Sequence, residues 1–366
     1  MFVRSAVLVV LGTAAAAAAP PDRAAALAAW ERGRAWYEKG EFDKSIAEYD
    51  AAVRLDPTNP ASFLSRGCAR AQKKQWAEAV KDFDEVTRLD PRNAWGFYNR
   101  GYARAQLRDF ALAIRDFDEA VRLDPRHALA FHNRGNAWFD SDDFDRAIAD
   151  YDTAARLDPT HAPTLLARGS ARAAKRDFGA AERDFSAAAR LGAKNPAVYL
   201  SRSYARQRLR DWVGAAADAE QVTRLTPDDS EGWHCLGEAR KWLGDWKGSL
   251  AGFDEAIRLD PRHALAHANR AMLRAGCPDA AFRDGKKAVA DAERACELTM
   301  WEESYALEAR AAAAAEVGDF AAAVRWQRQV LDDREYLTLN GDFVRRRLEL
   351  YEAGMPFRAT PVRRVD

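Results

Sequence analysis

The chain contains 366 residues, and its 56 lysine and arginine residues balance 56 aspartate and glutamate residues, so the formal net charge is zero. A protein that binds nucleic acid through its phosphates needs an excess of positive charge, so this balance argues against that class of function. Hydrophobic residues make up 48% of the chain and charged residues 31%, which is the composition of a folded chain and not of a disordered one.

Residues 1–19 have a short basic start, an apolar stretch and small residues at Ala17, Ala18 and Ala19. This pattern predicts a signal peptide and therefore a periplasmic or secreted protein of the bacterial cell envelope. A membrane anchor is the alternative, but the apolar stretch is short against the roughly 20 residues that a span requires. Pro20 and Pro21 blur the cleavage position. Charges recur every few residues elsewhere, so we expect no membrane span in the mature chain.

A proline recurs every 34 residues in most of the chain, which indicates an internal repeat. The series comprises Pro57, Pro91, Pro125, Pro159, Pro227 and Pro261, with Ala193 at the place of a missing member. If this proline is position 32, the first eight repeats start at residues 26, 60, 94, 128, 162, 196, 230 and 264.

Four further positions recur in these repeats, and each has a packing reason. Position 8 is usually glycine and position 20 alanine or serine, which leaves room for two helices to approach closely. Positions 17 and 24 are mostly aromatic and lie on one helix face, where they can fill the seam. Aspartate at position 16 can cap the second helix, and the Leu-Asp-Pro sequence ends it. Each repeat is therefore predicted to be an antiparallel helix pair.

These residues resemble the tetratricopeptide repeat family, which implies an all-α fold, a right-handed α-solenoid of antiparallel helix pairs. Seven nearly regular copies cover residues 26–263. The eighth repeat, 264–303, is lengthened by five residues at its turn, and a ninth starts at 304, so the array spans 26–335. Val344, Leu348 and Tyr351 share a helix face and predict a capping helix over 340–352. Residues 22–25 and the tail 353–366 are expected to lack regular structure.

Position 7, which is commonly leucine in this family, is arginine in most of these repeats, and position 23 is acidic. Because the two helices are antiparallel, we predict an arginine–carboxylate pair inside each repeat, with independent solvated charges as the alternative. The predicted pairs are Arg32–Glu48, Arg66–Asp82, Arg100–Asp116, Arg134–Asp150, Arg168–Asp184, Arg202–Asp218 and Arg270–Asp291. The seventh repeat loses both partners together, at Leu236 and Gly252. Arg310 faces Trp326 where its acid should be.

No motif for catalysis, cofactor binding or metal binding stands out, so we expect a protein that is not an enzyme and has no cofactor. His263 and His267 have a four-residue spacing that suits one helix face, but no accompanying metal motif. Asp140 to Asp145 lack the glycine and glutamate of a calcium loop. The four cysteines are expected to pack as small apolar residues, and a Cys277–Cys296 bridge is disfavoured.

The resemblance also implies a binding surface, because first helices line the concave face of such arrays through positions 2, 5, 6, 9, 12 and 13. We call these positions the groove face. Aromatic and amide side chains there suit an extended peptide or a partner helix. The predicted groove residues are Trp95, Tyr98, Asn99, Tyr102, His132, Asn133, Asn136, Phe139, Tyr204, His234 and Trp242. Packing between repeats is the alternative role for about half of the aromatic residues. Position 5 lacks lysine, so the resemblance does not support a peptide-carboxylate clamp.

The sequence therefore predicts a non-enzymatic scaffold that binds a protein or peptide partner in its groove. The alternative is a small-molecule carrier or enzyme that uses the extended eighth repeat, where the loop 277–284 and the residues after it carry Arg283, Asp284, Lys286 and Lys287. RNA recognition is disfavoured because it needs a basic groove. Nothing in the sequence indicates the oligomeric state.

Overall fold

The computed structural model describes residues 22–192 and 194–359, and all regular structure in these ranges is helical. The predicted signal peptide, residues 1–19, and the last tail residues, 360–366, lie outside the described ranges. The chain divides after Asp143 into two compact units. Within the described ranges, no helix combines the length and the hydropathy needed to cross a membrane.

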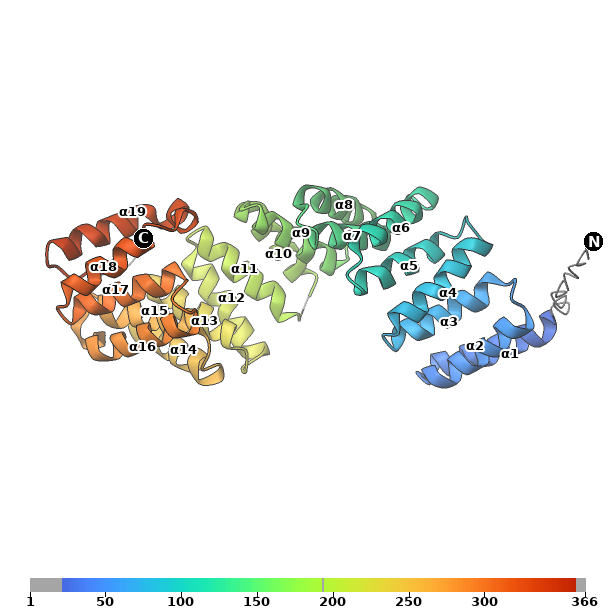
Figure 1. Ribbon diagram of the computed structural model, residues 1–366, viewed down its shortest axis with the longest axis horizontal. Coiled ribbons are helices and arrows are strands. Elements are labelled where there is room, and N and C mark those ends of the chain that lie inside the picture. The colour runs from blue at the N-terminus through green and yellow to red at the C-terminus, as the bar shows by residue number, and fades with distance from the viewer. Residues whose placement is uncertain (1–21, 193, 360–366) are drawn as a thin grey trace, which may run out of the picture. The chain divides into compact units, whose positions relative to one another are not determined.

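The first unit contains three complete helix pairs and the first helix of the fourth. Its helices are α1 (Arg23–Glu38), α2 (Phe42–Leu55), α3 (Pro60–Gln72), α4 (Trp76–Leu89), α5 (Ala94–Gln106), α6 (Phe110–Leu123) and α7 (Ala128–Phe139). Each helix packs on the next in chain order, and the short turns between them make the neighbours antiparallel (Figure 1).

The second unit continues the same pattern to the end of the described chain. Its helices are α8 (Phe144–Leu157), α9 (Ala162–Ala174), α10 (Phe178–Arg190), α11 (Pro196–Arg208), α12 (Trp212–Leu225), α13 (Ser230–Trp242), α14 (Trp246–Leu259), α15 (Ala264–Gly276), the 3-10 helix η1 (Ala280–Phe282), α16 (Gly285–Leu298), α17 (Ser304–Glu316), α18 (Phe320–Val330) and α19 (Arg334–Glu352). Both units are stacks of helix pairs, which confirms the predicted all-α solenoid class.

Where a repeat has glycine at position 8 and an aromatic residue at position 24, the two meet at the contact between its two helices. A Cβ atom at Gly67 would lie 2.6 Å from the Phe83 ring, and one at Gly169 would lie 2.5 Å from the Phe185 ring. Both rings are buried. A larger residue at position 8 would therefore collide with such a ring, which explains why glycine recurs in the repeats that have the aromatic residue.

Aspartate at position 16 caps the second helix of several repeats, as expected. Asp177 accepts a hydrogen bond from the backbone N–H of Ala180 at 3.0 Å, and Asp211 and Asp245 make the same contact one turn into α12 and α14. Each cap satisfies one of the N–H groups that a helix start leaves unpaired.

Two helix starts differ from the sequence-based boundaries. Residues 22–25 were expected to be irregular, but α1 begins at Arg23 because Asp22 accepts from the Ala25 backbone N–H at 3.0 Å. The capping helix α19 begins at Arg334 rather than at 340. Asp333 caps it by accepting from the Tyr336 backbone N–H at 2.9 Å. Both caps lie outside the apolar periodicity from which the boundaries were drawn.

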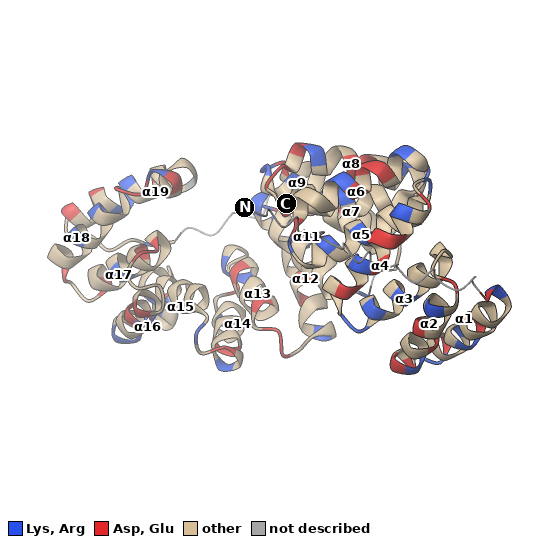
Figure 2. Cartoon of the chain, turned by 45° about the vertical axis from the view of Figure 1, so that its right-hand side comes forward, with Lys and Arg blue, Asp and Glu red and all other residues tan. Residues whose placement is uncertain are grey.

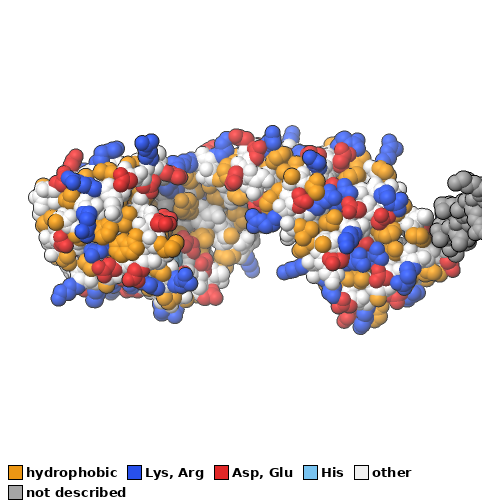
Figure 3. All heavy atoms as spheres, in the orientation of Figure 1, with side chains coloured by type: hydrophobic (Ala, Val, Ile, Leu, Met, Phe, Trp, Pro, Cys, Tyr) orange, Lys and Arg blue, Asp and Glu red, His pale blue; other side chains and the backbone are white. Residues whose placement is uncertain are grey.

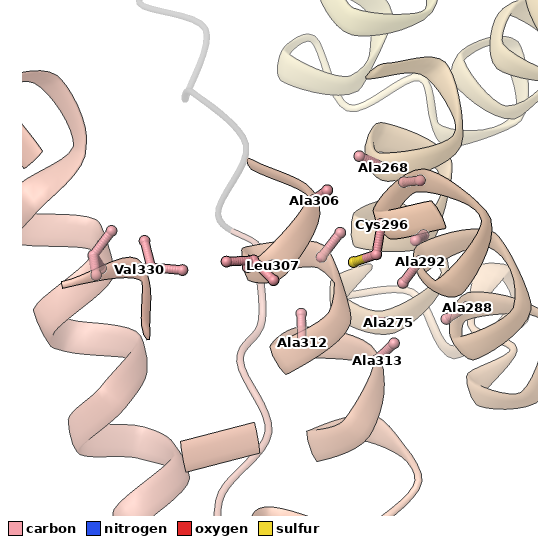
Figure 4. Packing of buried hydrophobic residues seen from close by; sticks show 14 residues of the cluster. Ala268, Ala275, Ala288, Ala292, Cys296, Ala306, Leu307, Ala312, Ala313 and Val330 are labelled. Atoms are coloured by element: carbon pink, nitrogen blue, oxygen red, sulfur yellow. The ribbon is translucent and has the colours of Figure 1, made fainter. Parts of the chain in front are cut away.

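Alanine dominates the core of the last repeats. Cys296 is completely buried in a cluster formed mainly by alanines of α15, α16 and α17. Leu307 and Val330 belong to the same cluster, on the side away from α15 (Figure 4). The cysteine therefore fills a gap among small side chains, which is the packing role predicted for it. All four cysteines are free thiols in the structure.

Six of the predicted charge pairs are present, and in all of these except Arg32–Glu48 the carboxylate is buried. Arg100 Nη2 lies 2.6 Å from Asp116 Oδ1, where the aspartate side chain is 3% exposed. The equivalent contacts occur at Arg32–Glu48, Arg66–Asp82, Arg168–Asp184, Arg202–Asp218 and Arg270–Asp291. The prediction of an arginine–carboxylate pair between the two helices is confirmed for these repeats.

The network extends beyond the predicted pairs in two directions. Arg104, one turn after Arg100, also binds Asp116, at 2.7 Å. Arg100 in turn reaches back to Asp84 of the preceding repeat at 2.9 Å. Arg310 keeps only this second contact, since its Nη2 lies 3.0 Å from Glu293 of the preceding helix α16. The position-7 arginine thus links consecutive repeats as well as the two helices of one repeat. Figure 2 shows that charges of both signs are spread along the helices of each unit.

Candidate functional site

A hollow on the groove face of the first unit gathers four of the predicted residues. Tyr102, Asn133, Asn136 and Phe139 line a cavity of about 220 Å³, together with Ala105, Gln106, Ala137 and Asp140. The lining residues come from α5 and α7, the first helices of consecutive repeats, and from Asp140 at the end of α7. Aromatic and amide side chains therefore share one concave surface, which can contact both the side chains and the backbone of an extended peptide.

An aromatic cluster lies beside this cavity. Its members differ in how much of each side chain is exposed to solvent. The rings of Trp95, Tyr98 and His127 contact one another in edge-on and tilted arrangements, with centroids 4.5 to 5.6 Å apart. Trp95 is 53% exposed, whereas Tyr98 is largely covered and its burial raises its phenol pKa. Tyr98 thus packs between repeats, the alternative left open by the sequence, while Trp95 is available to a partner.

The amide side chains of this face are tied to one another. Asn133 Nδ2 donates to Tyr98 Oη at 3.0 Å, and Asn136 Nδ2 lies 3.2 Å from His132 Nε2. Asn99 Nδ2 donates to the backbone oxygen of Trp95 on its own helix at 2.7 Å. These contacts hold the amides in place, so they present remaining donors and acceptors in a fixed arrangement.

The larger hollow of the groove face lies in the second unit. It has a volume of about 320 Å³ and is lined by Ser170, Ala173, Phe185, Leu200, Ser201, Tyr204, Glu231 and Cys235. Tyr204, a predicted groove residue, is 51% exposed at its wall. Its apolar lining and single carboxylate suit a partner segment that brings an apolar side chain and a hydrogen-bond donor.

Two predicted residues of the second unit do not line that hollow. His234 is only 2% exposed, and Trp242 stacks on Trp212 with ring centroids 5.0 Å apart. Trp242 borders a different and smaller cavity of about 70 Å³, which also contacts Lys241 and Arg347. Both residues thus pack against other side chains of the same unit.

Three residues that line the larger hollow occupy groove positions but are missing from the predicted set. Leu200, Glu231 and Cys235 occupy positions 5, 2 and 6 of their repeats, within the set that defines the groove face. They were omitted because only aromatic, amide and histidine side chains were selected there. The repeat numbering itself was the signal that could have found them.

Beneath the rim of the larger hollow, the half-exposed Glu231 carboxylate contacts two histidines and a buried cysteine. Glu231 Oε1 lies 3.4 Å from His234 Nδ1 and 3.7 Å from Cys235 Sγ, and Glu231 Oε2 lies 3.1 Å from His263 Nε2. The two histidines hold the pKa of the Glu231 carboxyl well below its usual range. Burial, first of all, raises the pKa of the Cys235 thiol.

The four-residue spacing of His263 and His267 does not create a shared site. His267 Nδ1 lies 3.8 Å from Asp291 and its Nε2 lies 3.2 Å from the backbone oxygen of Pro261. His263, by contrast, contacts Glu231. The histidine that the structure brings next to His263 is His234, with ring centroids 4.9 Å apart.

Comparisons with known proteins agree with this architecture. A family profile described as "Tetratricopeptide repeat" matches residues 98–162, and one described as "TPR repeat" matches residues 33–73 and 67–108. Residues 33–162 of the chain are therefore tetratricopeptide repeats. No curated protein matches it significantly.

Solved structures of other tetratricopeptide repeat proteins share the fold. PilF of Pseudomonas aeruginosa is 19% identical, with a TM-score of 0.53 over 59% of this chain and 98% of that chain. A tetratricopeptide repeat protein from Parabacteroides merdae is 17% identical, with a TM-score of 0.50 over 65% of this chain and 94% of that chain. Likeness at these identities concerns the fold and not the ligand.

The end of the tetratricopeptide repeat array carries an extended segment on its groove face. After α19 the chain turns back, and the Ala359 backbone N–H donates to the Gly276 backbone oxygen at 2.7 Å. Arg358 Nη1 lies 2.7 Å from Glu316 Oε2. Phe357 lies against Gly276, where a Cβ atom would meet its ring at 2.4 Å. Gly276 and Glu316 both occupy position 13, so the segment crosses groove positions of α15 and α17.

The lengthened turn of the eighth repeat is held by its own side chains. Arg283 Nη1 donates to the backbone oxygen of Cys277 at 2.8 Å, and its Nε lies 3.3 Å from Glu316. Asp284 caps α16 by accepting from the Lys287 backbone N–H at 3.0 Å. Arg283 and Asp284 therefore have local structural contacts in this turn.

Proposed function

We propose that this tetratricopeptide repeat protein is a non-enzymatic interaction scaffold that binds extended protein or peptide segments on its groove face. The observation that carries the proposal is the docked segment Met355–Ala359, in which an aromatic side chain, a basic side chain and a backbone N–H all contact groove positions. The chain thus supplies an internal example of the ligand class.

The two hollows offer comparable surfaces to a separate partner. The hollow beside Tyr102 presents aromatic and amide groups, and the hollow beside Tyr204 presents apolar walls with Glu231 at its rim. Exposed aromatic side chains supply large contact area at a small loss of conformational entropy. The face in view in Figure 3 mixes hydrophobic patches with charges of both signs, so this face offers local contacts rather than a uniform field.

Crosslinking mass spectrometry on the native envelope fraction tests the scaffold function. The double variant Tyr102→Ala plus Tyr204→Ala removes the exposed aromatic residues from both hollows, and we expect it to lose its crosslinked partners while circular dichroism stays helical. The matched control is Leu112→Ala plus Val213→Ala, which truncates exposed apolar residues on second helices. Equal crosslinking by wild type and the Tyr102/Tyr204 variant would contradict groove binding.

The proposal includes export to the cell envelope, supported by the basic start and apolar stretch within residues 1–19. Cell fractionation followed by amino-terminal sequencing checks it. We expect the mature protein outside the cytoplasm with its first residue near Ala18 to Pro20. An intact amino terminus in the cytoplasmic fraction would refute export without affecting the groove.

A small-molecule carrier or enzyme built on the eighth repeat is the alternative function. The deletion of residues 278–282 separates the two hypotheses, because it removes the lengthened turn and leaves both hollows with their lining residues. The scaffold predicts unchanged partner crosslinking in this variant, whereas the alternative predicts that ligand binding disappears with the turn.

A further inference from the structure

A cluster of potential metal ligands lies where the seventh repeat meets the eighth. Glu231, His234 and Cys235 occupy one face of α13 at spacings of three and four residues, and their ligand atoms all lie within 4.8 Å of one another. His263, which precedes α15, brings a fourth donor to the same carboxylate. We propose that Glu231, His234, Cys235 and His263 bind a transition metal ion of the Zn²⁺ type.

The separations between donor atoms fit a tetrahedral ion. Bonds of about 2.0–2.2 Å to nitrogen and oxygen and about 2.3 Å to sulfur place tetrahedral ligand atoms about 3.3–3.6 Å apart. Glu231 Oε1 lies 3.4 Å from His234 Nδ1 and 3.7 Å from Cys235 Sγ. Glu231 Oε2 lies 3.1 Å from His263 Nε2. The donor atoms of Glu231, His234 and Cys235 thus already surround one centre, and His263 reaches it by turning from Glu231 Oε2 toward Oε1.

The two ring nitrogens that face Glu231 support a metal site independently of these distances. His234 Nδ1 and His263 Nε2 are buried and have no hydrogen-bond partner, although a Glu231 oxygen lies within 3.4 Å of each. The nitrogens are close to the carboxylate but not aligned with it. A buried ring nitrogen without a partner is costly, and a shared metal ion would satisfy both at once.

The surroundings provide an outer contact for one ring. Asn269 Nδ2 lies 3.1 Å from His234 Nε2, and Asn269 Oδ1 lies 3.3 Å from Lys241 Nζ. Coordination at Nδ1 leaves the His234 ring proton on Nε2, so the Asn269 amide must turn to accept that proton through Oδ1 and give up its contact with Lys241. His263 Nδ1 faces the Ala266 backbone N–H at 3.3 Å, a weak contact that is lost when coordination at Nε2 leaves the ring proton on Nδ1.

The donor set selects the class of metal. Two imidazoles with one carboxylate and one thiolate favour Zn²⁺ or Co²⁺ over the oxygen-preferring Ca²⁺ and Mg²⁺. Binding releases the thiol proton of Cys235, so affinity rises with pH. Glu231 has a side chain that is 46% exposed and also lines the 320 Å³ hollow, which gives an ion a route from solvent.

Titration of the full-length, chelator-treated protein with Co²⁺ under reducing conditions tests the site. We expect one equivalent to bind with the intense visible bands of tetrahedral Co²⁺ and a sulfur-to-cobalt charge-transfer band, and Zn²⁺ to displace it. His263→Gln and Glu231→Gln should each weaken binding at least about 10-fold, and Cys235→Ser should abolish the charge-transfer band.

His267→Gln is the matched control, because His267 is a buried histidine near His263 that contacts Asp291 instead of the cluster. It should bind Co²⁺ as the wild type does. Zn²⁺ should also raise the melting temperature of the wild type and of His267→Gln but not of Glu231→Gln, which keeps the size of the side chain. Octahedral spectra, less than one equivalent, or equal binding by every variant would show an adventitious ion only and overturn the proposal.

Discussion

The third and seventh repeats hold their two helices together by different means. In the third, Asp116 is buried between Arg100 and Arg104, which lie 2.6 Å and 2.7 Å from its oxygens. In the seventh, Leu236 is buried in place of the arginine, and Gly252 stands in place of the acid. A Cβ atom at Gly252 would lie 2.9 Å from the Gly237 Cα, so here two backbones meet directly.

The difference shows that the buried charge pair is one solution to helix pairing and not a requirement of the fold. Without the position-23 acid, Arg240 contacts Glu220 of the preceding repeat at 3.0 Å. The same repeat contributes Glu231 and His234 to the cluster proposed to bind a metal ion. The seventh repeat, which lacks the buried arginine–aspartate pair, thus has a different set of polar side chains, Glu231 and His234, near its start.

The largest effect is expected from removing the centre of the third repeat's network. Asp116→Ala leaves two partly buried guanidinium groups without their shared partner, which costs about 3–5 kcal/mol. Native-state hydrogen exchange of α5 and α6 measures the local loss, because long repeat arrays need not unfold in one step. Asp118→Ala is the control, since that side chain is exposed and should cost less than about 1 kcal/mol. Equal exchange in both variants would mean that the buried pair does not stabilise the repeat.

A smaller loss is expected from separating the backbones of the seventh repeat. Gly252→Ala forces a methyl group against Gly237 and the Trp233 backbone oxygen, which costs about 1–3 kcal/mol by overpacking. Gly179→Ala, at a helical site where the nearest atom would be 3.8 Å away, should instead be neutral or slightly stabilising. Exchange of α13 and α14 amides compared with α9 and α10 amides distinguishes these outcomes. Unchanged α13 and α14 exchange would refute the close contact.

The sequence predicts the repeating architecture well because each repeat solves the same local packing problem. Gly67 and Phe83, or Arg66 and Asp82, are read directly from the 34-residue register. Contacts that do not repeat lie beyond that register. His263 meets His234 rather than His267, because the turn after α14 sets its direction and helical spacing does not. The two hollows likewise depend on how neighbouring side chains pack. The 34-residue register therefore predicts which positions lie on the groove face, but not which residues line each hollow.

The smallest expected effect compares the caps of the second helices in the same two repeats. Asp245 accepts from the Gly248 N–H at 2.9 Å, whereas Asp109 accepts from the Leu112 N–H at 3.4 Å. Because the shorter bond is stronger, Asp245→Ala should cost about 1 kcal/mol and Asp109→Ala about 0.5 kcal/mol. Hydrogen exchange in the first turns of α14 and α6 measures both. A larger loss at Asp109 would mean that the cap distance does not rank the stability of these two helix starts.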